Sequence, residues 1–143
     1  MNNKFLKLKG FTLIELLVVI SILGVLAGLI VSNMAGARER ARDAQRKSDL
    51  KEIQNALEMY KQDQDAPLYP TAAEFKTVLE SEPVYMKEVP EDPLGGWPPY
   101  FYETADQTDY TLRACLENAS DPQGIEAETS VCESGKKFEL NAP

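Results

Sequence analysis

The sequence predicts an α+β fold, in which one long N-terminal helix packs its second half against a small antiparallel β-sheet. Three observations support this prediction. Residues 16–37 are largely apolar and include no charged side chain. From residue 38 to residue 65 the chain contains no proline and is rich in good helix formers. Three short β-prone segments follow, at residues 100–103, 110–116 and 137–140.

The apolar segment has the length of a membrane span. At about 1.5 Å per residue, residues 16–37 extend about 30 Å, which is the thickness of a bilayer core. Lys4, Lys7 and Lys9 precede the segment, with no acidic residue among them. This charge pattern places the N-terminus in the cytoplasm and the rest of the chain outside it. Two alternatives stay open: a secretory signal cut after the small residues 35–37, and an uncleaved signal anchor.

The helix is expected to cover residues 11–62, and its exported half has two kinds of face. Small and then bulky side chains recur at helical spacing: Ala37, Ala41, Ala44 and Ser48, followed by Leu50, Ile53, Leu57 and Tyr60. The bulky face is expected to contact the globular part of the chain. The small face either packs against other helices or is simply solvated. The interleaved charges, Glu39, Arg42, Asp43 and Arg46, are expected to lie in solvent and to add little stability.

The globular part is expected to start where proline ends the helix. Pro67 follows Asp65 and Ala66, and the residue before a proline avoids helical geometry. Thr71 is then expected to cap a short helix over residues 72–81, with Glu74 in the reciprocal capping position. Several prolines indicate a loop that runs to about residue 99.

Charge and composition exclude several functions. Residues 52–143 carry six basic and 19 acidic side chains, so this part has a net charge of −13 and is expected to repel nucleic acid. The chain has no histidine, and its serines therefore have no histidine base to activate them. We expect no catalytic site, no enzyme activity and no metal site that requires histidine.

Two features of the C-terminal third suggest chemistry. Cys115 and Cys132 are the only cysteines, and in an exported protein such a pair is expected to form a disulfide. Two unrelated thiols in a cytosolic protein are the alternative. No cofactor is expected. Calcium is the one candidate ligand, because four acidic residues could supply oxygen atoms, although their spacing is irregular: Glu117, Asp121, Glu126 and Glu128.

One acidic residue lies at the start of the apolar segment. Glu15 costs about 2.5–3.5 kcal/mol at a bilayer centre, and less near its edge, so it calls for a partner. Lys7 or Lys9 could pair with it within the same chain. If the chain were cut after Gly10, the new α-amine of Phe11 could instead pair with Glu15 of a neighbouring copy. A carboxylate simply tolerated near the headgroups is the alternative.

The run Phe11-Thr12-Leu13-Ile14-Glu15, after a basic leader that ends in Gly10, resembles the prepilin signal of type IV pilins and type II secretion pseudopilins. The resemblance covers about residues 7–36. It implies a pilin-like fold, cleavage after Gly10 by an integral-membrane prepilin peptidase, N-methylation of Phe11 and a role for Glu15 in subunit registration. One departure is that residues 31–33 read Val-Ser-Asn where many relatives have proline, which leaves a helix bend there open.

The resemblance also implies a division of the chain and a set of partners. Residues 1–10 would be a cleaved leader, residues 11–36 a transmembrane and assembly segment, and residues 37–143 a globular part in the periplasm or at the cell surface. The subunit would start in the cytoplasmic (inner) membrane and enter a homo-oligomeric filament through an inner-membrane assembly platform. The segment from Asp92 to Trp97, with the tyrosine-rich strand after it, also resembles a turn and strand in the heads of many pilins and major pseudopilins.

The leading functional hypothesis is therefore a structural filament subunit. The position of the cysteine pair resembles the disulfide-bounded loop of type IV pilins, and for this reason we expect a pilus subunit rather than a major-type pseudopilin of a type II secretion system, which is the alternative. A signal-anchored monomeric binding module is a further hypothesis from a different class. The N-terminal residue of the mature chain separates these hypotheses.

Overall fold

The computed structural model describes residues 10–143, apart from the side chains of residues 30–33. The basic leader, with Lys4, Lys7 and Lys9, lies outside the described residues, and so does any side-chain effect of the Val-Ser-Asn run. The chain divides into two compact units, with the boundary between Ala37 and Arg38. We call residues 38–143 the head.

Helix α1 (Leu13–Asp63) runs through both units. It starts directly after Thr12, and its course agrees with the helix predicted over residues 11–62. At its end, Gln64 N donates to Lys61 O at 3.4 Å, and the chain then leaves the helix ahead of Pro67. The helix therefore ends where the restriction imposed by a following proline predicts that it should.

The head contains one four-stranded antiparallel sheet, in the order β1-β2-β4-β3. Its strands are β1 (Phe101–Glu103), β2 (Thr111–Cys115), β3 (Ile125–Glu126) and β4 (Lys136–Asn141). The central pair is in a register that places Leu112 opposite Leu140 and Ala114 opposite Phe138. The sequence predicted β1, β2 and β4 but not β3, because a two-residue strand has no alternation to detect.

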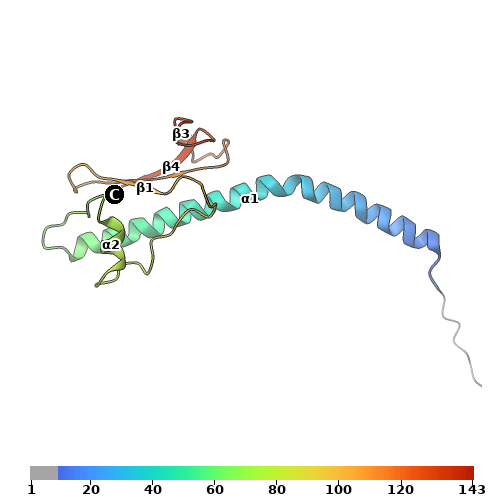
Figure 1. Cartoon of the computed structure of the whole chain (residues 1–143), viewed down its shortest axis with the longest axis horizontal. Helices are drawn as coiled ribbons and strands as arrows, with labels where there is room; N and C mark the ends of the chain where they lie inside the picture. Colours follow the sequence, from blue (N-terminus) through green and yellow to red (C-terminus); the bar gives the residue numbers. More distant parts are fainter. Residues whose placement is uncertain (1–9) are drawn as a thin grey trace, which may run out of the picture. The chain divides into compact units, whose positions relative to one another are not determined.

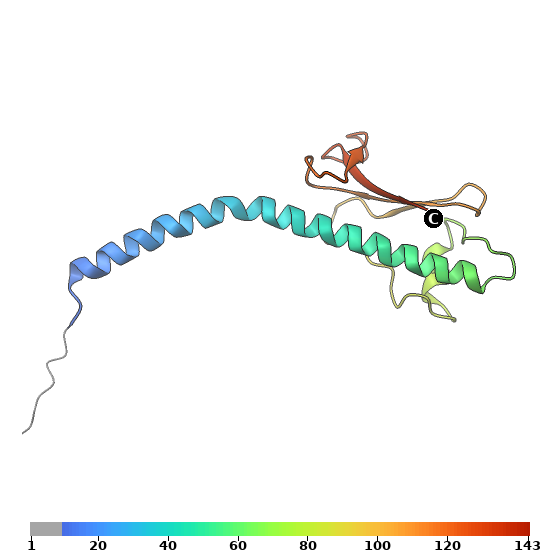
Figure 2. The same ribbon diagram turned by 180° about the vertical axis from the view of Figure 1, so that it is seen from behind.

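The core of the head lies between the second half of α1 and the sheet, which run side by side in both views (Figure 1, Figure 2). From the helix, Leu50, Ile53 and Leu57 are completely buried at the predicted helical spacing. From β2, Leu112 and Ala114 point into the same core, while the alternate positions face away from it. The helix and strand periodicities thus meet on one apolar surface, and the structure is the predicted α+β, pilin-like fold.

Helix α2 (Phe75–Glu80) is shorter than the predicted helix over residues 72–81. Thr71 does not cap it: the Thr71 hydroxyl donates to the Glu74 carboxylate at 2.8 Å, and no side-chain cap bond is made to the helix. Residues 72–74 form a turn instead. The predicted capping box is therefore wrong, because the two side chains satisfy each other rather than the backbone. Leu79 is completely buried in the core.

Candidate functional site: the N-terminal segment and the ion-pair cluster of the head

The junction between Gly10 and Phe11 precedes the first turn of α1. Gly10 is exposed, and among the described residues no heavy atom beyond Gly10 and its chain neighbours lies within 4 Å of the position that a Cβ would take. The Phe11 side chain is 91 % exposed. A protease requires its target bond in an accessible, non-helical segment, and the described part of this junction has both properties.

Glu15 has a partner within its own helix. Its carboxylate accepts a hydrogen bond from Thr12 N at 2.9 Å and one from the Thr12 hydroxyl at 2.8 Å. In return, Glu15 N donates to the Thr12 hydroxyl oxygen at 3.3 Å. These three bonds form a capping box at the start of α1. The spacing Thr-x-x-Glu is the sequence signal for this contact, whereas the partners predicted above are Lys7, Lys9 and the α-amine of Phe11. The carboxylate stays exposed.

The first unit presents apolar side chains on all sides. The large apolar side chains between residues 11 and 29 are all about half exposed or more, from 48 % at Val18 to 91 % at Phe11. In water such a helix would be unfavourable, since an all-round apolar surface is normally buried in lipid or in other protein.

Within the described residues, no single helical segment is both long and apolar enough to cross a membrane. The segments Leu13–Leu29 and Met34–Asp63, which are bent relative to each other, have the necessary length and composition only when they are taken together.

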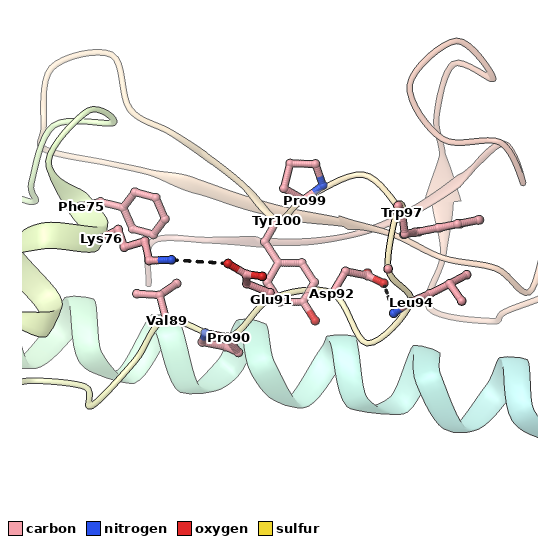
Figure 3. A pocket seen from close by; sticks show the side chains of 12 residues that line it. Phe75, Lys76, Val89, Pro90, Glu91, Asp92, Leu94, Trp97, Pro99 and Tyr100 are labelled. Atoms are coloured by element: carbon pink, nitrogen blue, oxygen red, sulfur yellow. Dashed lines mark hydrogen bonds and ion pairs between the residues drawn. The ribbon is translucent and has the colours of Figure 1, made fainter.

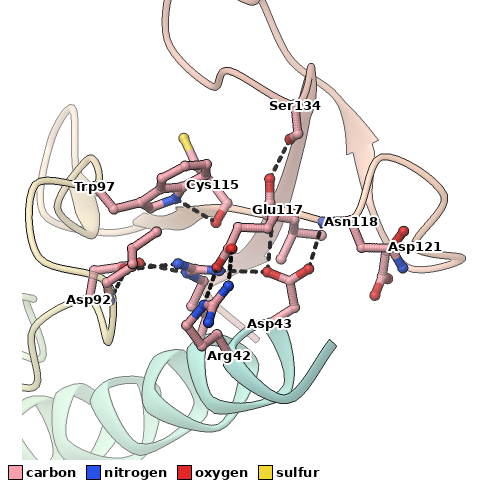
Figure 4. Close-up of polar contacts among 12 residues, drawn as sticks. Arg42, Asp43, Asp92, Trp97, Cys115, Glu117, Asn118, Asp121 and Ser134 are labelled. Carbon is pink, nitrogen blue, oxygen red and sulfur yellow. Dashed lines mark hydrogen bonds and ion pairs between the residues drawn. The ribbon is translucent and has the colours of Figure 1, made fainter. Parts of the chain in front are cut away.

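A cluster of buried charges lies where α1 meets the loops of the head (Figure 4). Arg46 is completely buried, and its guanidinium donates to three carboxylates. It contacts Asp43 at 2.7 Å and Glu117 at 2.6 Å through Nη1, and Asp92 at 2.6 and 2.8 Å through Nε and Nη2. Arg46 also lies over the ring of Trp97, 5.2 Å from its centre. One side chain thus joins the helix to two separate loops.

The buried Asp43 carboxylate has backbone partners in addition to Arg46. Besides Arg46, its carboxylate accepts backbone hydrogen bonds from Glu117 N and Asn118 N, both at 2.9 Å. The prediction that these helix charges lie in solvent is therefore wrong for Asp43 and Arg46. Helical spacing alone could not show this, because the partners come from loops that lie far away in the sequence. Glu39 is half-buried and Arg42 reaches the edge of the cluster.

Two further ion pairs hold the loop after β2 against α1. Arg42 donates to Glu117 through Nε at 2.7 Å, and this hydrogen bond, together with Arg46, lowers the pKa of Glu117 below its usual value. Lys47 donates to both oxygens of Asp121 at 2.7 Å. Burial raises the pKa of Asp121, but the bond from Lys47 and backbone donors outweigh it, so the pKa is lowered overall.

Cys115 and Cys132 form a disulfide, as the sequence predicts, and both are almost completely buried. The bridge closes the acidic loop that carries the residues considered for calcium. Three of these already have basic partners: Glu117 with Arg42 and Arg46, Asp121 with Lys47, and Glu126 with Lys136. In the described part of the chain, no three His, Cys, Asp or Glu side chains gather in a way that could hold a metal ion. The expectation of no cofactor, with calcium as the one candidate ligand, stays a prediction.

A helix that is apolar all round, attached to a small α+β head and preceded by a glycine at an open junction, defines the class of pilin-like subunits. A model of the prokaryotic N-terminal methylation motif matches residues 7–31. Three proteins named type II secretion system core protein G are similar to the chain. The protein of Aeromonas hydrophila is 40 % identical over an alignment of 98 residues that covers 60 % of this chain and 67 % of the relative.

The protein of Vibrio cholerae is 37 % identical over 104 residues, covering 65 % of this chain and 70 % of the relative. That of Escherichia coli is 40 % identical over 101 residues, covering 62 % and 68 %. The chain therefore belongs to the type II secretion system core protein G family. No solved structure matches the chain significantly. These relatives favour the secretion pseudopilin, the alternative given above, over the expected pilus subunit.

Proposed function

We propose that this chain is a structural, non-catalytic subunit of the filament of a type II secretion system, a pseudopilin of the major kind. It is made as a membrane-inserted precursor, with its leader in the cytoplasm and its head outside. The observation that carries this proposal is the all-round exposed apolar surface of residues 11–29 in a member of the core protein G family. Membrane lipid covers that surface before assembly, and neighbouring subunits cover it afterwards.

Processing would prepare the subunit for assembly. Prepilin peptidase would cut between Gly10 and Phe11, and the new N-terminus at Phe11 would be methylated. The open, non-helical backbone at this junction and the match of the methylation motif support this step. An assembly platform in the inner membrane would then pass the subunit into the growing filament.

Glu15 would set the register of each incoming subunit. After cleavage, the α-amine of Phe11 is a new positive charge close to the start of the helix, and Glu15 of an adjacent copy can pair with it. The capping box keeps the Glu15 carboxylate at the exposed start of α1, where a neighbour can reach it. In an apolar environment, such a pair stabilises the assembled state, whereas an isolated subunit carries an unpaired charge that costs free energy.

The substitution Glu15→Gln tests this role sharply. Glutamine can replace glutamate in a capping box, so the start of α1 keeps its hydrogen bonds while the charge is lost. We expect the variant to be made and processed normally, and the yield of sheared filaments to fall strongly. Glu39→Gln, in the same helix, is the matched control and should assemble normally. Filaments at wild-type yield from the Glu15→Gln protein would show that the charge pairing is not needed.

A pilus subunit is the second candidate, and the disulfide-bounded loop is the observation that favours it. The two candidates differ in what a deletion strain loses. We expect loss of exported enzymes from the culture medium, with surface pili and their motility retained. Loss of pili with normal secretion would instead support the pilus subunit.

A further inference from the structure

A preformed groove lies on the head between α2 and the loop that leads to β1 (Figure 3). Its volume is about 410 Å³, and its walls are mostly apolar and aromatic: Phe75, Val89, Leu94, Trp97 and Tyr100. At the rim, Lys76 Nζ lies 3.7 Å from a Glu91 oxygen, and the Glu91 side chain is 86 % exposed. This long, solvated pair contributes little, so Lys76 is available to another acidic group.

The aromatic walls are held in place by polar contacts behind them. The indole N–H of Trp97 donates to Cys115 O at 3.4 Å, and the Arg46 guanidinium lies over a face of the ring, 5.2 Å from its centre. The Tyr100 hydroxyl donates to the nearly buried Asp49 at 2.6 Å. Gly96 has φ +86°, a conformation that favours glycine, within the turn that presents Trp97. A groove with fixed walls loses little conformational entropy when it is filled.

The disulfide-bounded loop presents a complementary surface elsewhere on the head. Ile125 is 45 % exposed and Val131 is 48 % exposed. Both lie near Lys137. Ile125 is opposite Lys137 in the pairing of β3 with β4, and Val131 and Lys137 line one small cavity. Among the described residues, Glu128 has a hydrogen bond from Ser130 but no basic partner. The loop therefore offers apolar side chains next to an uncompensated negative charge.

We propose that this loop of one copy docks into the groove of the adjacent copy, with Ile125 and Val131 against the aromatic walls and Glu128 beside Lys76. The loop carries no basic residue between Cys115 and Lys136 that would repel Lys76, and Glu128 can pair with Lys76 in place of the exposed Glu91. The inference rests on the proposed filament function. Strand β3 and helix α2 lie on different sides of the head (Figure 1, Figure 2), so the contact joins two different surfaces. Such a contact repeats from copy to copy and builds an open filament.

Site-specific photocrosslinking in assembled filaments tests the contact. The photoreactive residue p-benzoylphenylalanine replaces Val131, and in a control it replaces Val84, which is 52 % exposed and lies outside both surfaces. We expect crosslinked dimers from the Val131 position, with the second chain attached in the groove, at residues 75–76 or within residues 89–100, and no such product from Val84. Normal filaments in which Val131 crosslinks to another region, or to an exported protein, would overturn the inference and leave the filament function standing.

Charge reversal gives an independent readout. Lys76→Glu and Glu128→Lys should each lower filament yield about tenfold, and the two together should restore it, because only the pair returns opposite charges to the rim. The unfolding midpoint, followed by Trp97 fluorescence, should stay at the wild-type value in all three proteins. A double variant as poor as the single ones would contradict the contact. Absence of filaments from the wild-type protein would refute the proposed function itself.

Discussion

The position of Arg46 makes it important for the stability of the head, because this one side chain connects helix α1 to two loops. Its guanidinium is completely buried and has carboxylate partners from the helix, the loop before β1 and the loop after β2. A buried ion pair need not stabilise a protein more than an apolar contact would, because both charges lose their hydration. Loss of one partner is different, since it leaves the remaining charges buried and uncompensated.

Replacement of Arg46 by methionine should destabilise the head by about 3–5 kcal/mol, which is the usual cost of an unpaired buried charge. Arg40→Met removes an exposed arginine from the same helix, and this control should change stability by less than about 0.5 kcal/mol. The measurement is urea unfolding of the full chain in detergent. Fluorescence of Trp97, the only tryptophan, reports on the cluster directly. Equal stability of the two variants would contradict the role given to Arg46.

The head should also lose stability at acidic pH, because Glu117 then becomes protonated and its ion pairs are lost. Arg42 and Arg46 lower the pKa of this carboxyl in the folded state, below the ordinary value of 4.5. The unfolded state then binds a proton more readily, so the stabilisation is fully present above about pH 4.5 and is lost as the pH falls through the lower, folded pKa. Unfolding curves between pH 7 and pH 3 measure this. Glu117→Gln should be less stable at pH 7 and should lose less on acidification than the wild type.

At the scale of elements, the loop between β2 and β4 contains little regular structure. Its one strand, β3, has two residues. Two contacts hold it: the disulfide between Cys115 and Cys132 joins its two ends, and the ion pair of Lys47 with Asp121 fixes its first part to α1. The proposed docking surface lies between these anchors, so its shape depends on both of them.

Removal of the disulfide should lower the stability of the head by about 3 kcal/mol, because the open chain gains conformational freedom when it unfolds. The double variant Cys115→Ser/Cys132→Ser and the reduced wild-type protein should show the same lower melting midpoint. Ser120→Ala changes an exposed position in the same loop, and this control should keep the wild-type midpoint. An unchanged midpoint after reduction would mean that the bridge does not stabilise the head.

At the scale of the whole molecule, the two units suit different surroundings. Residues 11–29 expose apolar side chains throughout, whereas the head encloses an apolar core beneath a strongly acidic surface. Under the proposed function, lipid or other subunits cover the first unit, and removal of the leader leaves the helix that follows it intact.

Mass spectrometry of the mature protein should find an N-terminus at methylated Phe11. Gly10→Val should leave the precursor intact, because a β-branched side chain replaces the glycine next to the bond to be cut. Ala37→Val, at the end of the apolar segment, is the control and should be processed normally. A mature chain that begins at Met1 would indicate a simple signal anchor, and one that begins at Arg38 would indicate an ordinary secretory signal.

The sequence by itself determined the long helix, the three longer strands and the disulfide. These follow from local rules. The helical spacing of Leu50, Ile53 and Leu57 and the proline after α1 predict the helix and its end, and the presence of two cysteines in a chain expected to be exported predicts the disulfide. Tertiary structure alone decided which charges are buried. Asp43 and Arg46 look like solvent-facing helix residues, and only the approach of two distant loops encloses them. The same approach creates the groove beside Trp97, because a cavity depends on segments that only the folded chain brings together.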